Sequence, residues 1–387
     1  MEINFTENKR FQFRVVVFLC SIIFFSVLNG TMFNVAIPDI ARDFSLSAAE
    51  VSWVMTGYII VFALASVTYG KLADIYPVRR LMVIGLLLFN VGALLGYLSQ
   101  NYSTLLVGRF VQASGGGAIP AMAMLVATRY FPVTARGRVL GAAASTVAFA
   151  AGVGPVAGGF IAGNWHWRYL FLVSLVTLLA VYGALRLLPK EKTRPDSFDT
   201  VGAVLLGIAV TTLLVFVTQI FWLALPVALC FFALFFRHID RTDNPFVSPQ
   251  LLQNKLFRQG LVCTFFSVGT VFGYFFSIPL LLRMVYALPT LQIGMIIFPG
   301  ALSAACLGFV GGRMADRVGS TPVVYAGLGL LLTGYLLMAG MLGQGVLAVL
   351  LVLIVCYTGF SFIQSALAKS VSTTLPQDKA GVGMGLY

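Results

Sequence analysis

The feature that most constrains this sequence is a series of twelve long apolar stretches separated by short polar segments. A helix needs about 20 mostly apolar residues to cross the roughly 30 Å hydrocarbon core of a bilayer. A membrane barrel would instead need segments of about ten residues that alternate polar and apolar side chains, and the sequence contains none. We therefore expect an all-α polytopic membrane protein. The predicted helices cover residues 13–37, 51–72, 80–98, 103–128, 138–162, 167–188, 200–217, 219–236, 259–282, 291–312, 321–342 and 345–372.

Composition and charge support a bilayer-spanning chain. Hydrophobic residues make up 59% of the 387 positions, too many for the core of one soluble globule. The net charge of +12 is unevenly placed, because 21 of the 25 Lys and Arg residues fall in segments on one side of the predicted helices. This asymmetry follows the positive-inside rule and puts the amino terminus in the cytoplasm. The basic charge thus reports topology, and we expect no nucleic-acid partner.

Two short segments repeat each other. Residues 70–74 read GKLAD and residues 312–316 read GRMAD, which aligns Gly70 with Gly312 and Asp74 with Asp316. Each segment follows the second helix of a set, the first set beginning at residue 13 and the other at residue 259. Internal repeats of this kind are typical of transporters that rock two bundles about a central site.

The polar segments divide the chain into five parts. We predict an N-terminal six-helix bundle over 1–188, a cytoplasmic linker over 189–198 and an intervening helix pair over 199–236. A cytoplasmic connector over 237–258 follows, and 259–387 forms a C-terminal bundle of four helices plus the start of a fifth.

Six segments carry a resemblance to a known family: LNGTMFNVAIPDIARDF, GKLADIYPVRR, GRFVQASGGGAIPA, RGRVLGAAAS, AGVGPVAGG and FDTVG. The chain resembles the major facilitator superfamily, in particular its 14-helix branch of drug:proton antiporters, and is most similar to the tetracycline/proton antiporters of Gram-positive bacteria. The resemblance implies two pseudo-symmetric bundles with two intervening helices and a place in the bacterial cytoplasmic membrane. Because the sequence ends where helix 13 of that family begins, we expect the functional protein to continue beyond Tyr387.

The charged segment after the second helix is the first candidate site. Gly70 permits a tight helix exit, and Asp74 can form a network with nearby cations at the membrane surface. The resemblance implies that this acid latches the cytoplasmic side in the outward-open state. The alternative is that these cations only set topology. The predicted latch residues are Gly70, Lys71, Asp74, Arg79, Arg80, Arg136, Arg138 and Asp316.

A second candidate site lies inside the first bundle. Arg109 falls well within the fourth helix, where an unpaired charge is costly, so it should face the bundle interior or water. The resemblance implies that it helps proton coupling together with Gln112; the alternative is a structural arginine bonded to backbone carbonyls. Isolated polar residues in other helices are candidates to line the cavity or to act as contacts between helices. They are Asn29, Thr31, Asn34, Tyr58 and Gln364.

The fifth helix contains a glycine-rich motif. Glycines four residues apart let another helix approach closely, and a proline removes one backbone hydrogen bond and bends the helix. The resemblance implies that this motif marks exporters and forms part of the contact between the bundles. Its residues are Gly152, Gly154, Pro155, Gly158 and Gly159.

The function predicted from these features is secondary export. Five scattered cysteines favour neither a disulfide framework nor a metal site, and no phosphate-binding loop or hydrolase constellation is present, so we expect no enzyme and no cofactor other than the proton gradient. The partners would be a small amphipathic substrate, protons and the bilayer, with the protein a monomer. Asn29 and Gly30 stand where the antiporter family carries a helix-1 carboxylate. Two alternatives stay open: export of an endogenous lipid or metabolite with different ion coupling, and a truncated relative that does not transport.

Overall fold

The computed structural model describes residues 9–191, 193, 197–219, 221–288, 290–341, 344–376 and 380–387. Every regular element in these ranges is a helix, which confirms the all-α prediction. The first half contains α1 (Lys9–Asp43), α2 (Ala48–Ile75), α3 (Val78–Tyr97), α4 (Tyr102–Gly116), α5 (Ala118–Tyr130), α6 (Val133–Asn164), η1 (Trp167–Tyr169), α7 (Leu170–Leu175) and α8 (Leu178–Leu187). The rest contains α9 (Thr200–Gln219), α10 (Ala224–Ile239), α11 (Pro249–Gln253), α12 (Lys255–Tyr286), α13 (Thr290–Val318), α14 (Ser320–Met341), α15 (Val346–Thr374) and α16 (Ala380–Leu386).

Ten segments within the described ranges are long and apolar enough to cross a bilayer, and α10 is a shorter apolar helix. Two predicted spans are divided into pieces: α4 and α5 meet at Gly117, while η1, α7 and α8 follow one another over 167–187. The eighth predicted span starts five residues late, at Ala224, because residues 221–223 form the turn between α9 and α10. The charged linker 189–198 lies partly outside the described residues, which omit 192 and 194–196.

Local capping explains one of the sharp helix starts. Ser47 and Glu50 form a capping box that opens α2: the Glu50 carboxylate accepts a hydrogen bond from the Ser47 backbone N–H at 2.8 Å, and the Ser47 hydroxyl accepts one from the Glu50 N–H at 3.3 Å. Two backbone N–H groups that lack helical partners are satisfied in this way.

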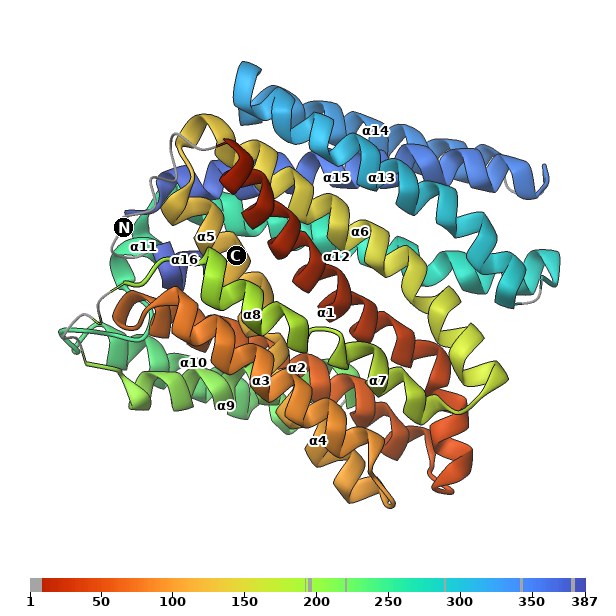
Figure 1. Cartoon of the computed structure of the whole chain (residues 1–387), viewed down its shortest axis with the longest axis horizontal. Coiled ribbons are helices and arrows are strands. Elements are labelled where there is room, and N and C mark those ends of the chain that lie inside the picture. Colours follow the sequence, from red (N-terminus) through yellow and green to blue (C-terminus); the bar gives the residue numbers. More distant parts are fainter. Residues whose placement is uncertain are drawn as a thin grey trace.

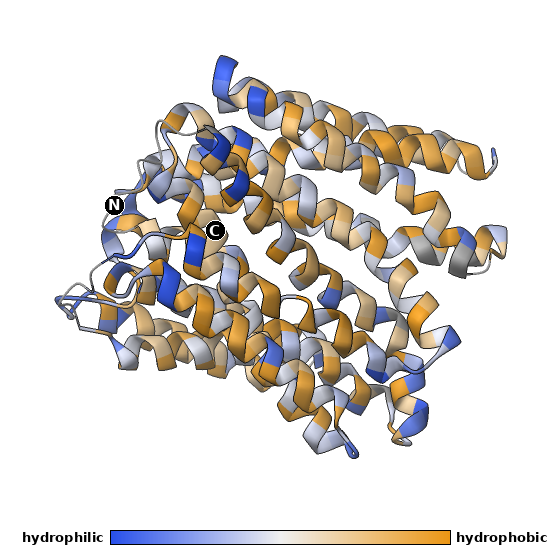
Figure 2. Cartoon of the chain, viewed as in Figure 1, coloured by the Kyte–Doolittle hydropathy of each residue, from blue (hydrophilic) through white to orange (hydrophobic). Residues whose placement is uncertain are grey.

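The two sets of helices meet along two seams. In the first seam, α6 packs against α13 and α15, and in the second, α16 packs against α2 and α5. Figure 1 shows α13, α14 and α15 along one side of the molecule and α9 and α10 along the other. Polar residues gather near the ends of the helices, with apolar residues along their middles (Figure 2). Cys356 is buried and Cys20 is half-buried, whereas Cys230, Cys263 and Cys306 are exposed.

Candidate functional site: two latches, a buried arginine and a cavity

The repeated segment in the first half forms a contact that we call the first latch. Asp74, in the last turn of α2, accepts hydrogen bonds from the backbone N–H groups of Gly381 at 3.0 Å and Val382 at 3.2 Å. These groups open α16, where the helix dipole favours a negative charge. The guanidinium of Arg129, at the end of α5, lies 3.5 Å from the same carboxylate and donates to the Ala73 carbonyl at 3.1 Å.

The repeated segment in the second half forms an equivalent contact, the second latch. Asp316, near the end of α13, accepts hydrogen bonds of 2.9 Å from the backbone N–H groups of Gly137 and Arg138 in the second turn of α6. The Lys369 ammonium lies 3.0 Å from Asp316 and donates to the Ala315 carbonyl at 2.6 Å. Each acid thus joins the second helix of its own half to the start of a helix in the other half. The end of the molecule that holds both contacts is the latch end.

Glycine makes each approach possible. A Cβ on Gly70 would lie 2.6 Å from the Gly381 carbonyl oxygen, and one on Gly312 would collide with the Gly137 carbonyl oxygen. Backbone atoms cannot swing away as a side chain can. The glycines of the two repeats are therefore part of the latches.

The cations differ in part from those predicted from the sequence. Arg129 is the cation within ion-pair distance of Asp74. Lys71 also acts electrostatically on this carboxylate, as the sequence predicts. Arg79 and Arg80 stand in the first turn of α3 and line a separate groove. Sequence reasoning missed Arg129 and Lys369 because each lies at a helix end far along the chain from its acid.

The two remaining predicted cations lie near the second latch. Arg136 donates through Nε to the Phe131 carbonyl at 3.2 Å, which ties down the start of α6. Arg138 contributes its backbone N–H rather than its side chain to Asp316. The second latch therefore depends on the backbone N–H of Arg138 and not on the charge of its side chain.

Arg109 is fully buried in the first half. Its Nη1 donates to Asn29 at 3.1 Å and to Gln112 at 2.9 Å, and its Nε donates to the Val54 carbonyl at 3.3 Å. The guanidinium carbon lies 3.9 Å from the centre of the Tyr58 ring and 4.3 Å from that of Phe33. Cation–π contacts and amide oxygens compensate the charge here, and no carboxylate among the described residues pairs with it.

Ser174 completes this cluster and was not predicted. Its hydroxyl oxygen accepts from Asn29 Nδ2 at 2.6 Å and from Gln112 Nε2 at 3.3 Å, so α7 closes the network that joins α1 and α4. A lone serine in an apolar stretch carries no signal in the sequence. Asn29 and Tyr58 thus surround Arg109.

A cavity of about 230 Å³ lies between the halves. Its walls come from α1, α2, α5, α6 and α15, and they are mostly apolar side chains such as Phe62, Met124 and Phe360. Gln364 and Ser26 are the polar residues of α15 and α1 that line it. The Gln364 side-chain oxygen is buried and has no hydrogen-bond partner among the described residues.

Two other predicted cavity residues have different surroundings. Thr31 donates to the carbonyls of Val27 and Leu28 in its own helix and faces α6. Asn34 is exposed one turn further along α1. Of the five candidates, Gln364 is the one that lines this cavity.

The glycines of the motif lie at close helix contacts, two of them within the first half and one between the halves. A Cβ on Gly154 would collide with Thr31, and one on Gly158 would lie 2.6 Å from the Met32 carbonyl oxygen, so both glycines admit α1. Gly152 faces Ala301 of α13, across the seam between the halves. Pro155 lies inside α6 and Gly159 is half-buried.

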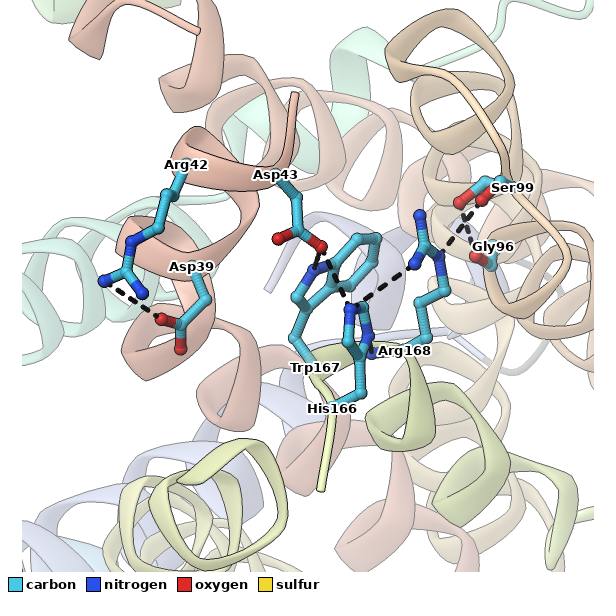
Figure 3. A network of polar contacts seen from close by, with 8 residues as sticks. All are labelled: Asp39, Arg42, Asp43, Gly96, Ser99, His166, Trp167 and Arg168. Atoms are coloured by element: carbon cyan, nitrogen blue, oxygen red, sulfur yellow. Dashed lines mark hydrogen bonds and ion pairs between the residues drawn. The ribbon is translucent and has the colours of Figure 1, made fainter. Parts of the chain in front are cut away.

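Figure 3 shows a polar network within the first half, where the end of α1, the turn after α3 and η1 meet. Trp167 is buried and donates through Nε1 to Asp43 at 2.7 Å, while His166 lies 3.0 Å from the same carboxylate. Arg168 donates to the Ser99 carbonyl at 3.1 Å. These contacts join α1, the turn after α3 and η1 within the first half, so they brace it as one body.

Comparisons with known proteins agree with this geometry. The sequence profile described as Major Facilitator Superfamily matches residues 19–200 and 196–387. The chain is 25% identical over 377 residues to the riboflavin transporter RibZ of Clostridioides difficile (strain 630), covering 95% of this chain and 82% of that protein. It is 30% identical over 321 residues to a multidrug resistance protein B homolog of Mycobacterium tuberculosis (strain CDC 1551 / Oshkosh), covering 79% of this chain and 59% of that protein.

Two solved structures share the fold. The human organic anion transporter MFSD10 (TETRAN) superposes with a TM-score of 0.72 at 16% identity, covering 97% of this chain and 89% of that one. The proton:xylose symporter XylE superposes with a TM-score of 0.68 at 12% identity, covering 98% and 85%. At these identities the likeness concerns the fold alone.

Proposed function

Because this chain belongs to the Major Facilitator Superfamily, we propose that it is a secondary exporter of amphipathic drugs, driven by proton antiport through alternating access. It is a multi-pass membrane transport protein and not an enzyme. The finer placement in the 14-helix drug:proton branch, with tetracycline-like or multidrug cargo, is supported by the six sequence segments and by the likeness to a multidrug resistance protein B homolog. We also propose a monomer in a bacterial cytoplasmic membrane, with its amino terminus in the cytoplasm.

The observation that carries this proposal is the apolar cavity between the two halves. A site formed by both halves can open to either side when they tilt, as alternating access requires. Aromatic and aliphatic walls favour an apolar ring system, and the unpartnered oxygen of Gln364 offers one acceptor to a cargo N–H or O–H group. Because both latch contacts are formed, we infer that they hold the two halves together at the latch end.

Proton coupling has to use groups other than a carboxylate deep in the described spans, since the described acids lie at helix ends or in connecting segments. The latch acids are the described carboxylates that lie between the halves. We propose that Asp74 and Asp316 release and re-form their contacts during the transport cycle. Arg109, Tyr58 and Gln112 hold the helices of the first half in the arrangement that proton coupling needs.

The test is transport in inverted membrane vesicles that contain the chain. We expect an imposed pH gradient to drive accumulation of a fluorescent amphipathic drug and a protonophore to abolish it. Gln364→Leu should raise the half-saturating drug concentration severalfold, whereas Gln253→Leu, the same change on exposed α11, should not. Accumulation that ignores the protonophore would rule out proton coupling, and absence of any transport would favour the non-transporting alternative.

A metabolite is the second candidate cargo. A relative that covers 95% of this chain is named a riboflavin transporter, and the flat ring system of riboflavin can stack against the aromatic walls of the cavity. Riboflavin competing with drug uptake at micromolar concentration would favour the metabolite, and drug uptake indifferent to riboflavin would favour the drug.

A further inference from the structure

A groove between α3 and α8 has surroundings that transport of a drug does not explain. It lies at the latch end, has a volume of about 490 Å³, and is lined by the start of α3 and by the segment that follows α8. The adjoining membrane spans are Val78–Tyr97 and Trp167–Leu187, so both reach their boundary here. The groove therefore lies at the depth of the lipid headgroups.

Three cations face this groove: Arg79, Arg80 and Lys190. None of them forms an ion pair with an acid in the part of the chain that the structure describes. The acid that also lines the groove, Glu191, is already engaged, because it lies 3.6 Å from Arg129 and accepts a hydrogen bond from the Val78 N–H at 3.1 Å. Among the described residues, the groove thus carries positive charge in excess of the acids that face it.

A strip of apolar side chains on α3 and α8, which we call the apolar lane, continues from the groove toward the membrane centre. Val83, Ile84 and Leu185 line the groove itself. Leu87 and Tyr182, one turn further along α3 and α8, are 44% and 64% exposed. Cations at one end and apolar side chains along the other match a molecule with an anionic head and acyl chains.

We propose that this groove binds an anionic phospholipid, with its phosphate among Arg79, Arg80 and Lys190 and an acyl chain along α3 and α8. Cations near a membrane surface attract acidic headgroups, and basic pockets between helices bind them specifically. A free phosphate would use the cations alone and leave the apolar lane unused. Because Glu191 lies between the groove and Arg129 of the first latch, a lipid bound here touches the segment that holds that latch.

The experiment is native mass spectrometry of the detergent-solubilised chain, titrated with phosphatidylglycerol or phosphatidylcholine. We expect phosphatidylglycerol to bind more tightly and its affinity to fall at least about tenfold in Arg79→Gln/Arg80→Gln/Lys190→Gln. The matched control, Lys255→Gln/Arg258→Gln/Arg317→Gln, removes three exposed cations elsewhere and should change the affinity less than twofold.

A second variant tests the acyl lane. Ile84→Gln/Leu185→Gln keeps all three cations and should also weaken phosphatidylglycerol binding, which keeps the proposal testable if the triple variant fails to fold. Equal losses in the groove and control triples would show general surface attraction and overturn the proposal. So would equal affinity for the two lipids, no loss in the lane variant, or displacement of phosphatidylglycerol by an equal concentration of inorganic phosphate.

Discussion

Lys369 lies 3.0 Å from Asp316 and also donates to the carbonyl of the residue that precedes this acid. In the first half, Arg129 makes both of the same contacts, to Asp74 and to the carbonyl before it. Each latch therefore consists of the same four kinds of group: an acid, a cation, a backbone carbonyl and a pair of N–H groups near the start of a helix. This correspondence between distant segments supports two related halves more strongly than the short sequence repeat alone.

The latch cations should hold their acids in place. Lys369→Gln leaves Asp316 buried with its two N–H contacts but without its counter-charge, and breaking a buried pair costs roughly 3 kcal/mol. We expect a lower thermal midpoint and impaired drug accumulation. Lys255→Gln, an exposed cation of α12, is the control and should behave as wild type. A Lys369→Gln protein with wild-type midpoint and transport would remove this cation from the latch.

The close approach of α6 to α13 should not tolerate a methyl group. Gly312→Ala directs its Cβ at the Gly137 carbonyl oxygen, and overpacking of this kind costs about 1–3 kcal/mol. Gly30→Ala adds the same group where nothing lies within 4 Å. We expect Gly312→Ala to lower the thermal midpoint and to reduce transport while Gly30→Ala does neither. Equal effects of the two changes would contradict the tight seam.

Arg109 should not be replaceable by lysine. Lysine keeps the charge but loses the planar fork that bonds Asn29, Gln112 and Val54, so buried acceptors remain unpaired at about 1–3 kcal/mol each. We expect Arg109→Lys to reduce thermal stability and to abolish most transport. Arg186→Lys, on the exposed face of α8 over Tyr182, serves as the matched control. Wild-type stability in Arg109→Lys would show that the network is dispensable.

Asp199 should make the start of α9 sensitive to acid. Burial opposes ionisation, but hydrogen bonds from the Gly202 N–H, the His238 ring and the Phe246 N–H outweigh it and lower the pKa of Asp199. A lowered folded-state pKa gives stability above the ordinary aspartate pKa of about 4, and this stability is lost as pH falls through the lower value.

Thermal midpoints between pH 7 and pH 3 measure this contribution. Asp199→Asn should be less stable than wild type at pH 7, and the deficit should shrink below about pH 4. Asp240→Asn, on the exposed end of α10, should follow wild type throughout. A deficit in Asp199→Asn that stays constant over the whole range would contradict the role of its charge.

The sequence was sufficient to predict the helical fold, because long apolar stretches leave a direct pattern. Its repeat and its glycines pointed to positions where the structure has two acid contacts and close helix approaches. It could not reveal Arg129, Lys369 or Ser174 as partners, since each acts across the fold at a position that is unremarkable in its own helix. Asn29 and Tyr58 illustrate the same difficulty. A polar residue in a helix can face a cavity or another buried group, and the packing of the helices determines which of the two it faces.

The most direct test of the central claim, that two halves tilt about a shared cavity while the latches hold one end closed, is a pair of spin-label distances in a chain without its native cysteines. Labels at Phe13 and Val318 report the latch end, and labels at Leu98 and Leu347 report the other; all four residues are exposed. We predict that Asp74→Asn/Asp316→Asn lengthens the first distance and shortens the second. Distances that stay unchanged, or that move in the same direction, would contradict the claim.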